Sequence, residues 1–341
     1  MEEKVCPISG SVYSGIGGQA VMEGVMMRNK DEYAVAVRKS DGSIIVKKDE
    51  YKGIVPGKAV YKIPIVRGIL SFIDSLVLGL STLNFSSDIY MQSAETASDE
   101  GEQPEEADVA AESKRGAGDT ILSAVIMIVA VILALGLFMV LPYLASLVFR
   151  PLVGEGIVLS LIEGLIRIII FIGYIKLISM MEDIRRVFMY HGAEHKCINC
   201  LEAGMPLNVE NVRRSSREHR RCGTSFLLYV MVISIIFFAF IRTDIRLLKV
   251  VLRIVLIPVI AGVSYEFIRL AGRSDNPLIK MISKPGLWLQ KLTTREPDDE
   301  MIEVGIRSVE EVFDWRSFLN ESFGDTGREV TPGQAGGADT R

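Results

Sequence analysis

Cysteine and histidine are scarce in this chain of 341 residues, which contains four cysteines and three histidines. Four cysteines are too few for a disulfide scaffold in a chain of this length. The chain also lacks a large excess of charge of one sign. It contains 38 lysines and arginines and 42 aspartates and glutamates, which gives a net charge of −4. This balance argues against an overall basic nucleic-acid-binding protein, and we expect no nucleic-acid partner.

The first residues lack a long apolar run. The opening sequence MEEKVCPISG has no apolar core of the kind found in a cleavable signal peptide. The whole chain, in contrast, is 49% hydrophobic and has a mean hydropathy of +0.31. A positive value is unusual for a soluble protein and indicates segments that lie in a lipid bilayer.

Four apolar windows are long enough to cross a bilayer, which takes about 20 residues of helix. Backbone groups in lipid must be satisfied within the segment, so all four are predicted to be helices. The predicted fold class is mainly α: a polytopic membrane bundle of four transmembrane helices with a small cytoplasmic β-containing N-terminal unit. The windows cover residues 120–149, 157–180, 224–241 and 247–270.

Basic residues predict the orientation of these windows. They concentrate between the second and third windows, which by the positive-inside rule places that loop and both termini in the cytoplasm of a multi-pass cell-membrane protein. A fifth apolar segment, 65–85, contains Arg67 and Asp74 and would break the even count, so we expect an interfacial or re-entrant helix. The loop carries Arg185, Arg186, Lys196, Arg213, Arg214, Arg217, Arg220 and Arg221.

The remaining segments predict smaller units. Residues 32–38 and 43–47 alternate in polarity around Ser40-Asp41-Gly42, which is typical of a β-hairpin. An apolar helix after the fourth window is predicted to break at Pro285-Gly286. The predicted units are a β-rich unit with a glycine-rich loop (1–60), an amphipathic or re-entrant helix (61–91), an acidic disordered linker (92–119), the bundle (120–272) with a His/Cys loop (181–223), interfacial and amphipathic helices (273–323) and a disordered tail (324–341).

All three histidines fall in the 181–223 loop. On a helix, His191 and His195 leave the same face, where two imidazoles can bind one zinc ion. Glu194 stands where a general base could reach a metal-bound water, and His-x-x-Glu-His is the inverted zincin pattern. The third ligand would be His219 or an acid elsewhere, for which Glu266 is a candidate.

The thiols offer a second interpretation of the same loop. Cys197, Cys200 and Cys222 with His219 would suit a closed structural zinc site. A third interpretation needs no metal: the histidines hydrogen-bond within a polar loop and the cysteines are small buried residues. We favour a divalent metal, zinc first, with mixed histidine and glutamate ligation preferred to the set of three cysteines and one histidine. The candidate metal residues are His191, His195, His219 and Cys222, with Cys200 as an accessory.

Residues 15–28 form an unusual glycine-rich stretch. Gly17 and Gly18 permit close approach of the backbone, and Glu23 and Arg28 could bind a polar group. The stretch matches neither a P-loop nor a dinucleotide fingerprint. It either covers the metal site or forms a tight turn.

Together, five segments resemble the YqhQ-like family of bacterial membrane proteins of unknown function, whose members are described as predicted metal-dependent enzymes. The resemblance covers about residues 12–314, and its pattern includes His191, Glu194, His195, His219 and Cys222. The family has proline where Arg220 stands and no regular cysteine at Cys197, which weakens the closed zinc site. The segments are GGQAVMEGVMMR, YHGAEHK, HRRCGTSFLL, YEFIRLAGR and PGLWLQKLTTREPDDEMIEV.

These observations lead to one functional hypothesis and two rivals. The first is a metal-dependent hydrolase at the cytoplasmic face, in which Glu194 activates water. The rivals are a non-enzymatic scaffold or transport-related protein with a structural His/Cys loop, and a metal or redox sensor that uses the cysteines. The substrate stays open, and a homo-oligomer is compatible with the sequence.

Overall fold

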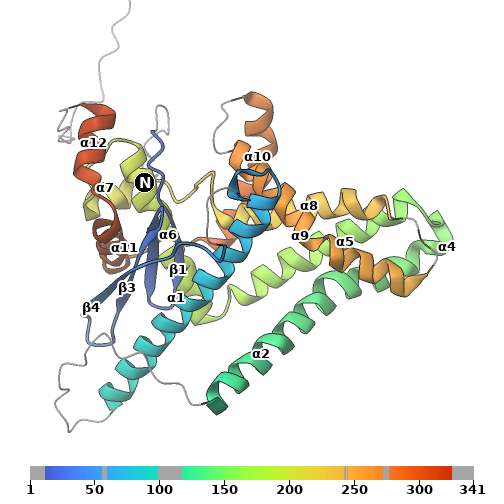
Figure 1. Ribbon diagram of the computed structural model, residues 1–341, viewed down its shortest axis with the longest axis horizontal. Coiled ribbons are helices and arrows are strands. Elements are labelled where there is room, and N and C mark those ends of the chain that lie inside the picture. Colours follow the sequence, from blue (N-terminus) through green and yellow to red (C-terminus); the bar gives the residue numbers. More distant parts are fainter. Residues whose placement is uncertain are drawn as a thin grey trace, which may run out of the picture.

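The computed structural model describes residues 12–55, 60–98, 117–241, 243, 245–271 and 276–324. The chain is mainly helical with one four-stranded sheet, so the predicted fold class is confirmed. Apolar helices extend to one side, whereas the sheet and the shorter helices gather on the other (Figure 1). Cys6, most of the predicted linker and nearly all of the predicted tail lie outside the described residues.

The sheet is an antiparallel meander in chain order. It consists of β1 (Gly17–Val21), β2 (Gly24–Asn29), β3 (Glu32–Arg38) and β4 (Ile44–Glu50). The predicted strands are confirmed, but the glycine-rich stretch is a β-hairpin and not a loop. Its two strands pair Gly17 with Arg28, and the turn places Glu23 at a φ of 49°. Successive side chains of β2 point to opposite faces of the sheet, so the apolar residues of this strand are buried on both faces.

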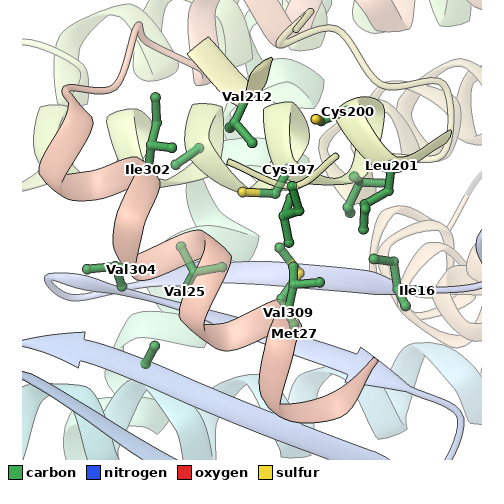
Figure 2. Packing of buried hydrophobic residues seen from close by; sticks show 14 of the residues in the cluster. Ile16, Val25, Met27, Cys197, Cys200, Leu201, Val212, Ile302, Val304 and Val309 are labelled. Carbon is green, nitrogen blue, oxygen red and sulfur yellow. The ribbon is translucent and has the colours of Figure 1, made fainter. Parts of the chain in front are cut away.

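Both faces of the sheet are covered, which explains why β2 and β3 are almost entirely buried. On one face, Val25 and Met27 pack against α6 (Glu182–Glu202) and α11 (Asp299–Val312), as Figure 2 shows. On the other face, Val35 packs against Leu78 of α1 (Val66–Ser98). Met301, Val304, Val309 and Val312 of α11 are buried and form one apolar stripe along this helix.

Four helical segments are long and apolar enough to cross a membrane: Val66–Ser93, Val125–Val153, Ile157–Ile178 and Leu247–Ala271. The last three match predicted windows. The window 224–241 forms the shorter apolar helix α8 (Gly223–Ala239), and Val66–Ser93 belongs to α1, which extends beyond its predicted end.

The other helices complete the described chain. Residues between 117 and 153 form one nearly continuous helical segment with a π-helical turn. The elements are η1 (Val60–Lys62), α2 (Ala117–Leu135), η2 (Gly136–Val140), α3 (Leu141–Ser146), η3 (Leu147–Phe149), α4 (Arg150–Val153), α5 (Ile157–Ile178), α7 (Val209–Arg214), α9 (Arg246–Ala271), α10 (Pro277–Thr293) and α12 (Trp315–Phe323).

Helix α10 runs through Pro285 and Gly286, so the predicted break is wrong. Pro285 is exposed, and its missing N–H removes one bond from a helix that packs on α8. Gly286 is needed at this crossing, because a Cβ there would lie 2.9 Å from Ser225 Oγ of α8. Tertiary packing therefore outweighs the local cost of proline.

A buried ionic cluster joins three helices of the bundle. Glu163 of α5 accepts a hydrogen bond at 2.7 Å from Arg167, which lies four residues further along the same helix. The same carboxylate accepts two bonds of 2.6 Å from Arg253 of α9. Arg167 also donates to Ser234 Oγ of α8 at 2.8 Å, so the cluster fixes the relative position of α5, α8 and α9.

Candidate metal centre

Three side chains from two elements converge at one point. His191 and His195 lie one turn apart on α6, and Cys222 is the N-cap residue of α8. Their ligand atoms, one from each residue, all lie within 4.8 Å of one another. We call these residues the His–His–Cys group. His195 and Cys222 are buried and His191 is partly buried.

The two imidazoles are oriented by backbone carbonyls. His191 Nδ1 lies 2.9 Å from the carbonyl of Thr293, and His195 Nδ1 lies 2.5 Å from that of Arg217. Because a carbonyl only accepts, both Nδ1 atoms carry the proton, and Nε2 of a neutral ring then presents a lone pair. This is the arrangement that metal-binding histidines show, in which the second ring nitrogen donates to a carbonyl or carboxylate.

The second ring nitrogen of each histidine, Nε2, is the one available to bind a metal beside the Cys222 thiol. His191 Nε2 lies 3.2 Å from Cys222 Sγ. His195 Nε2 is buried and makes no hydrogen bond within the described part of the chain. A buried polar atom without a partner costs free energy, and a cation between the three ligand atoms would satisfy it. The residues therefore fit a metal ion.

The surroundings of Cys222 favour the thiolate form of its side chain. Burial alone would raise the pKa of its thiol, but neighbouring His195 and His191 lower that pKa well below its ordinary value. The Thr224 backbone N–H also donates to Sγ at 3.4 Å, at the positive end of α8. Burial opposes protonation of His191, yet the Cys222 thiolate raises the pKa of His191 to about 9.

Glu194 lies beside this group. Its Oε2 is 4.0 Å from His191 Nε2, and burial raises the pKa of its carboxyl. The backbone N–H of Gly18 donates to the carboxylate, so the glycine-rich hairpin reaches the site through Gly18. A Cβ on Gly18 would lie 2.9 Å from Glu194 Cγ, whereas one on Gly17 would meet nothing within 4 Å.

His219 is near the group but outside it. Its ring centroid lies 5.5 Å from that of His195, and burial lowers the pKa of its imidazole well below the ordinary value. Its Nε2 lies 3.4 Å from an Arg221 guanidinium nitrogen. The structure thus brings Cys222 rather than His219 to the third ligand position.

Two residues of α10 hold the site, and the sequence patterns gave no indication of either. The Gln290 amide accepts from the backbone N–H of His219 at 2.8 Å and donates to its carbonyl at 2.7 Å. The carbonyl of Thr293 orients His191. Both residues lie in the family segment PGLWLQKLTT, which was the only available signal.

The closed zinc site with three cysteines does not form. Figure 2 shows Cys197 and Cys200 in the apolar core beside the sheet. Cys200 Sγ lies 3.5 Å from the carbonyl of Pro206, and a Cβ on Gly305 would lie 2.9 Å from Cys197 Sγ. Burial raises the pKa of Cys197 well above its ordinary value, as expected for a thiol that packs as an apolar residue.

The other predicted accessory residues bind elsewhere. Glu23 forms an ion pair with Arg186 and accepts from Tyr190 Oη at 3.2 Å, which braces α6 next to His191. Arg28 donates to the carbonyl of Lys30 at 2.7 Å. Glu266 forms an ion pair with Arg67 between α9 and α1, so its contacts are not with the histidines.

Taken together, the apolar helices and the His–His–Cys group define a candidate membrane protein with a possible metal site. The chain matches the profile of a family described as "Protein of unknown function (DUF1385)" over residues 63–315. It is 40% identical over 297 residues to the uncharacterized protein YqhQ of Bacillus subtilis strain 168, covering 87% of this chain and 91% of that protein. The chain belongs to this family. No solved structure matches it.

Proposed function

We propose that this protein is a metal-dependent hydrolase of the membrane surface on the cytoplasmic side. His191, His195 and Cys222 would hold a divalent ion, and mixed imidazole and thiolate donors favour zinc. The observation that carries the proposal is the paired orientation of the two imidazoles. Each Nδ1 is fixed by a carbonyl, and one Nε2 is buried without a hydrogen bond.

Three protein ligands are typical of catalytic rather than structural zinc sites, because one coordination position stays open. A bound ion would supply Lewis acidity for hydrolysis of a carbonyl or phosphoryl group. Glu194 would take and return the proton, since burial moves the pKa of its carboxyl upward, towards the range in which a general base works best. The Gly18 N–H would keep that carboxylate oriented.

The same geometry supports a second candidate, a cysteine nucleophile. Cys222 at a helix N-terminus, 3.2 Å from an imidazole nitrogen, resembles the thiolate–imidazolium pairs of acyl-transfer enzymes. Alkylation of the purified protein by iodoacetamide separates the two candidates. With a metal-bound thiolate, Cys222 reacts only after a chelator is added, whereas a free nucleophile reacts equally fast without it.

Glu194→Gln tests the hydrolase directly. Turnover of a panel of fluorogenic peptides, carboxylic esters and phosphate esters should be lost, while the metal content stays at the wild-type value. Glu182→Gln, an exposed acid on the same helix, should keep both. Loss of metal in Glu194→Gln would make Glu194 a ligand, and full turnover would exclude it as the general base.

A further inference from the structure

Helix α10 has two contrasting faces. Its inner face packs on the bundle: Leu289 lies in a buried cluster with Phe171 and Ile175 of α5 and Met231 of α8. Its outer face exposes an apolar stripe at spacings of three and four residues. The stripe consists of Leu278, Met281, Pro285 and Trp288.

The surroundings of this stripe indicate lipid rather than water. Trp288 is 52% exposed although tryptophan is costly to leave in water. Lys284 and Lys291 are exposed beside the stripe, where long stems can lie along acyl chains while the ammonium groups reach the headgroups. Tryptophan and lysine in these positions are typical of the membrane interface.

Helix α1 has the same organisation. Its outer face exposes a second apolar stripe, and its inner face is covered by the sheet. The backbone N–H of Met22 donates to Ser86 Oγ at 3.1 Å, and Ser40 Oγ donates to the carbonyl of Ser93 at 2.6 Å. The exposed stripe consists of Ile73, Leu76, Val77, Leu80 and Leu83.

The sheet decides whether α1 can cross the membrane. A helix that spans the bilayer would carry the attached sheet into the hydrocarbon, from Leu78 onward. Strands β1 and β4 are the two edges of the sheet, and β4 ends in Lys47, Lys48, Asp49 and Glu50. Open sheet edges do not occur in the hydrocarbon. Helix α1 must therefore stay on the same side of the membrane as the sheet, although it is long and apolar enough to cross.

We propose that α1 and α10 both lie along the membrane surface beside the His–His–Cys group, with their apolar stripes in contact with lipid. In Figure 1, α1 runs beside the sheet, and α10 lies next to the ends of α8 and α9 that are nearer the sheet. Both helices are attached to the bundle, because α10 packs on α8 and α1 packs on α9. The crossing segments are then 125–153, α5, α8 and α9, an even number.

This placement also limits how a molecule reaches the site. One face of α10 contacts lipid, and the other holds His191 and the 219–222 loop through Thr293 and Gln290. The His–His–Cys group then lies within about one helix diameter, roughly 10–12 Å, of the leaflet. If the proposed hydrolase function is correct, its substrate is an amphiphile held in that leaflet.

Fluorescence of the two tryptophans tests the position of α10. In bilayers with bromine at defined depths, Trp315→Phe leaves only Trp288, whose emission should fall most with bromines near the headgroups. Trp288→Phe leaves only Trp315, on α12, as a matched control that bromine should not quench. Quenching of Trp288 by aqueous iodide alone, or by neither agent because a second copy of the chain covers it, would overturn the proposal.

A thiol-labelling experiment tests α1 independently of any metal. Met91 is 57% exposed near the end of α1, and Glu321 is exposed on α12. In a Cys6→Ser background, Met91→Cys and Glu321→Cys should react with a membrane-impermeant maleimide from the same side of sealed vesicles. Reaction from opposite sides would show that α1 crosses the membrane and would overturn the proposal.

Discussion

The close approach of β1 to Glu194 makes a quantitative prediction about Gly18. An added Cβ there would lie 2.6 Å from the carbonyl oxygen of Met26 and 2.9 Å from Glu194 Cγ. The carbonyl belongs to a paired strand and cannot move freely, so Gly18→Ala must shift either the hairpin or α6. Overpacking of this kind costs about 1–3 kcal/mol. It would also strain the hydrogen bond from Gly18 to Glu194.

Gly17→Ala is the matched control, because its Cβ would meet nothing within 4 Å. This change should be neutral or should stabilise by up to about 0.5–1 kcal/mol through the entropy of the unfolded chain. The assay is urea unfolding of the full-length protein in mild detergent, followed by Trp315 emission in a Trp288→Phe background. The reasoning is refuted if the two alanine variants unfold within about 0.5 kcal/mol of each other, the range of ordinary surface changes.

Three further outcomes follow from the site and the bundle. Because the pKa of His191 is about 9, a proton competes with the metal for this imidazole below that pH. The zinc affinity, measured by competition with a chelator, should therefore rise about tenfold per pH unit from pH 7 and level off above pH 9. Glu163→Gln should cost about 3–5 kcal/mol in detergent unfolding, since it leaves buried arginines uncompensated, whereas Glu155→Gln in an exposed pair should cost under about 1 kcal/mol. Gln290→Ala leaves buried backbone groups of His219 without partners, which should cost about 1–3 kcal/mol and weaken metal binding without abolishing it.

Periodicity and local spacing predicted much of the fold. The alternation in 32–38 was predicted correctly, because the side-chain period of a strand follows directly from its backbone geometry. The continuous helix at Pro285 was missed, since packing of Gly286 against Ser225 is a tertiary effect with no local signal. The hairpin at 17–29 was missed because glycines suggested a loop.

The site was predicted in part for a similar reason. The pair His191 and His195 follows from helical spacing, and Glu194 follows from its place between them. Whether His219 or Cys222 becomes the third ligand depends on how the chain turns before α8. The two residues are only three positions apart, so the sequence does not show which of them faces the histidines of α6. The sets containing Cys197 and Cys200 were plausible by residue type alone, and only the fold shows these thiols in the apolar core.

The central claim is that His191, His195 and Cys222 together bind a metal ion, and elemental analysis combined with cobalt substitution tests it most directly. Wild-type protein should contain about one divalent ion per chain, and the cobalt form should show the thiolate-to-cobalt charge-transfer band. His191→Ala with His195→Ala should lose the metal, and Cys222→Ser should lose the band, while Cys197→Ser keeps both. Absence of stoichiometric metal from the wild type, or an unchanged band in Cys222→Ser, would contradict the account.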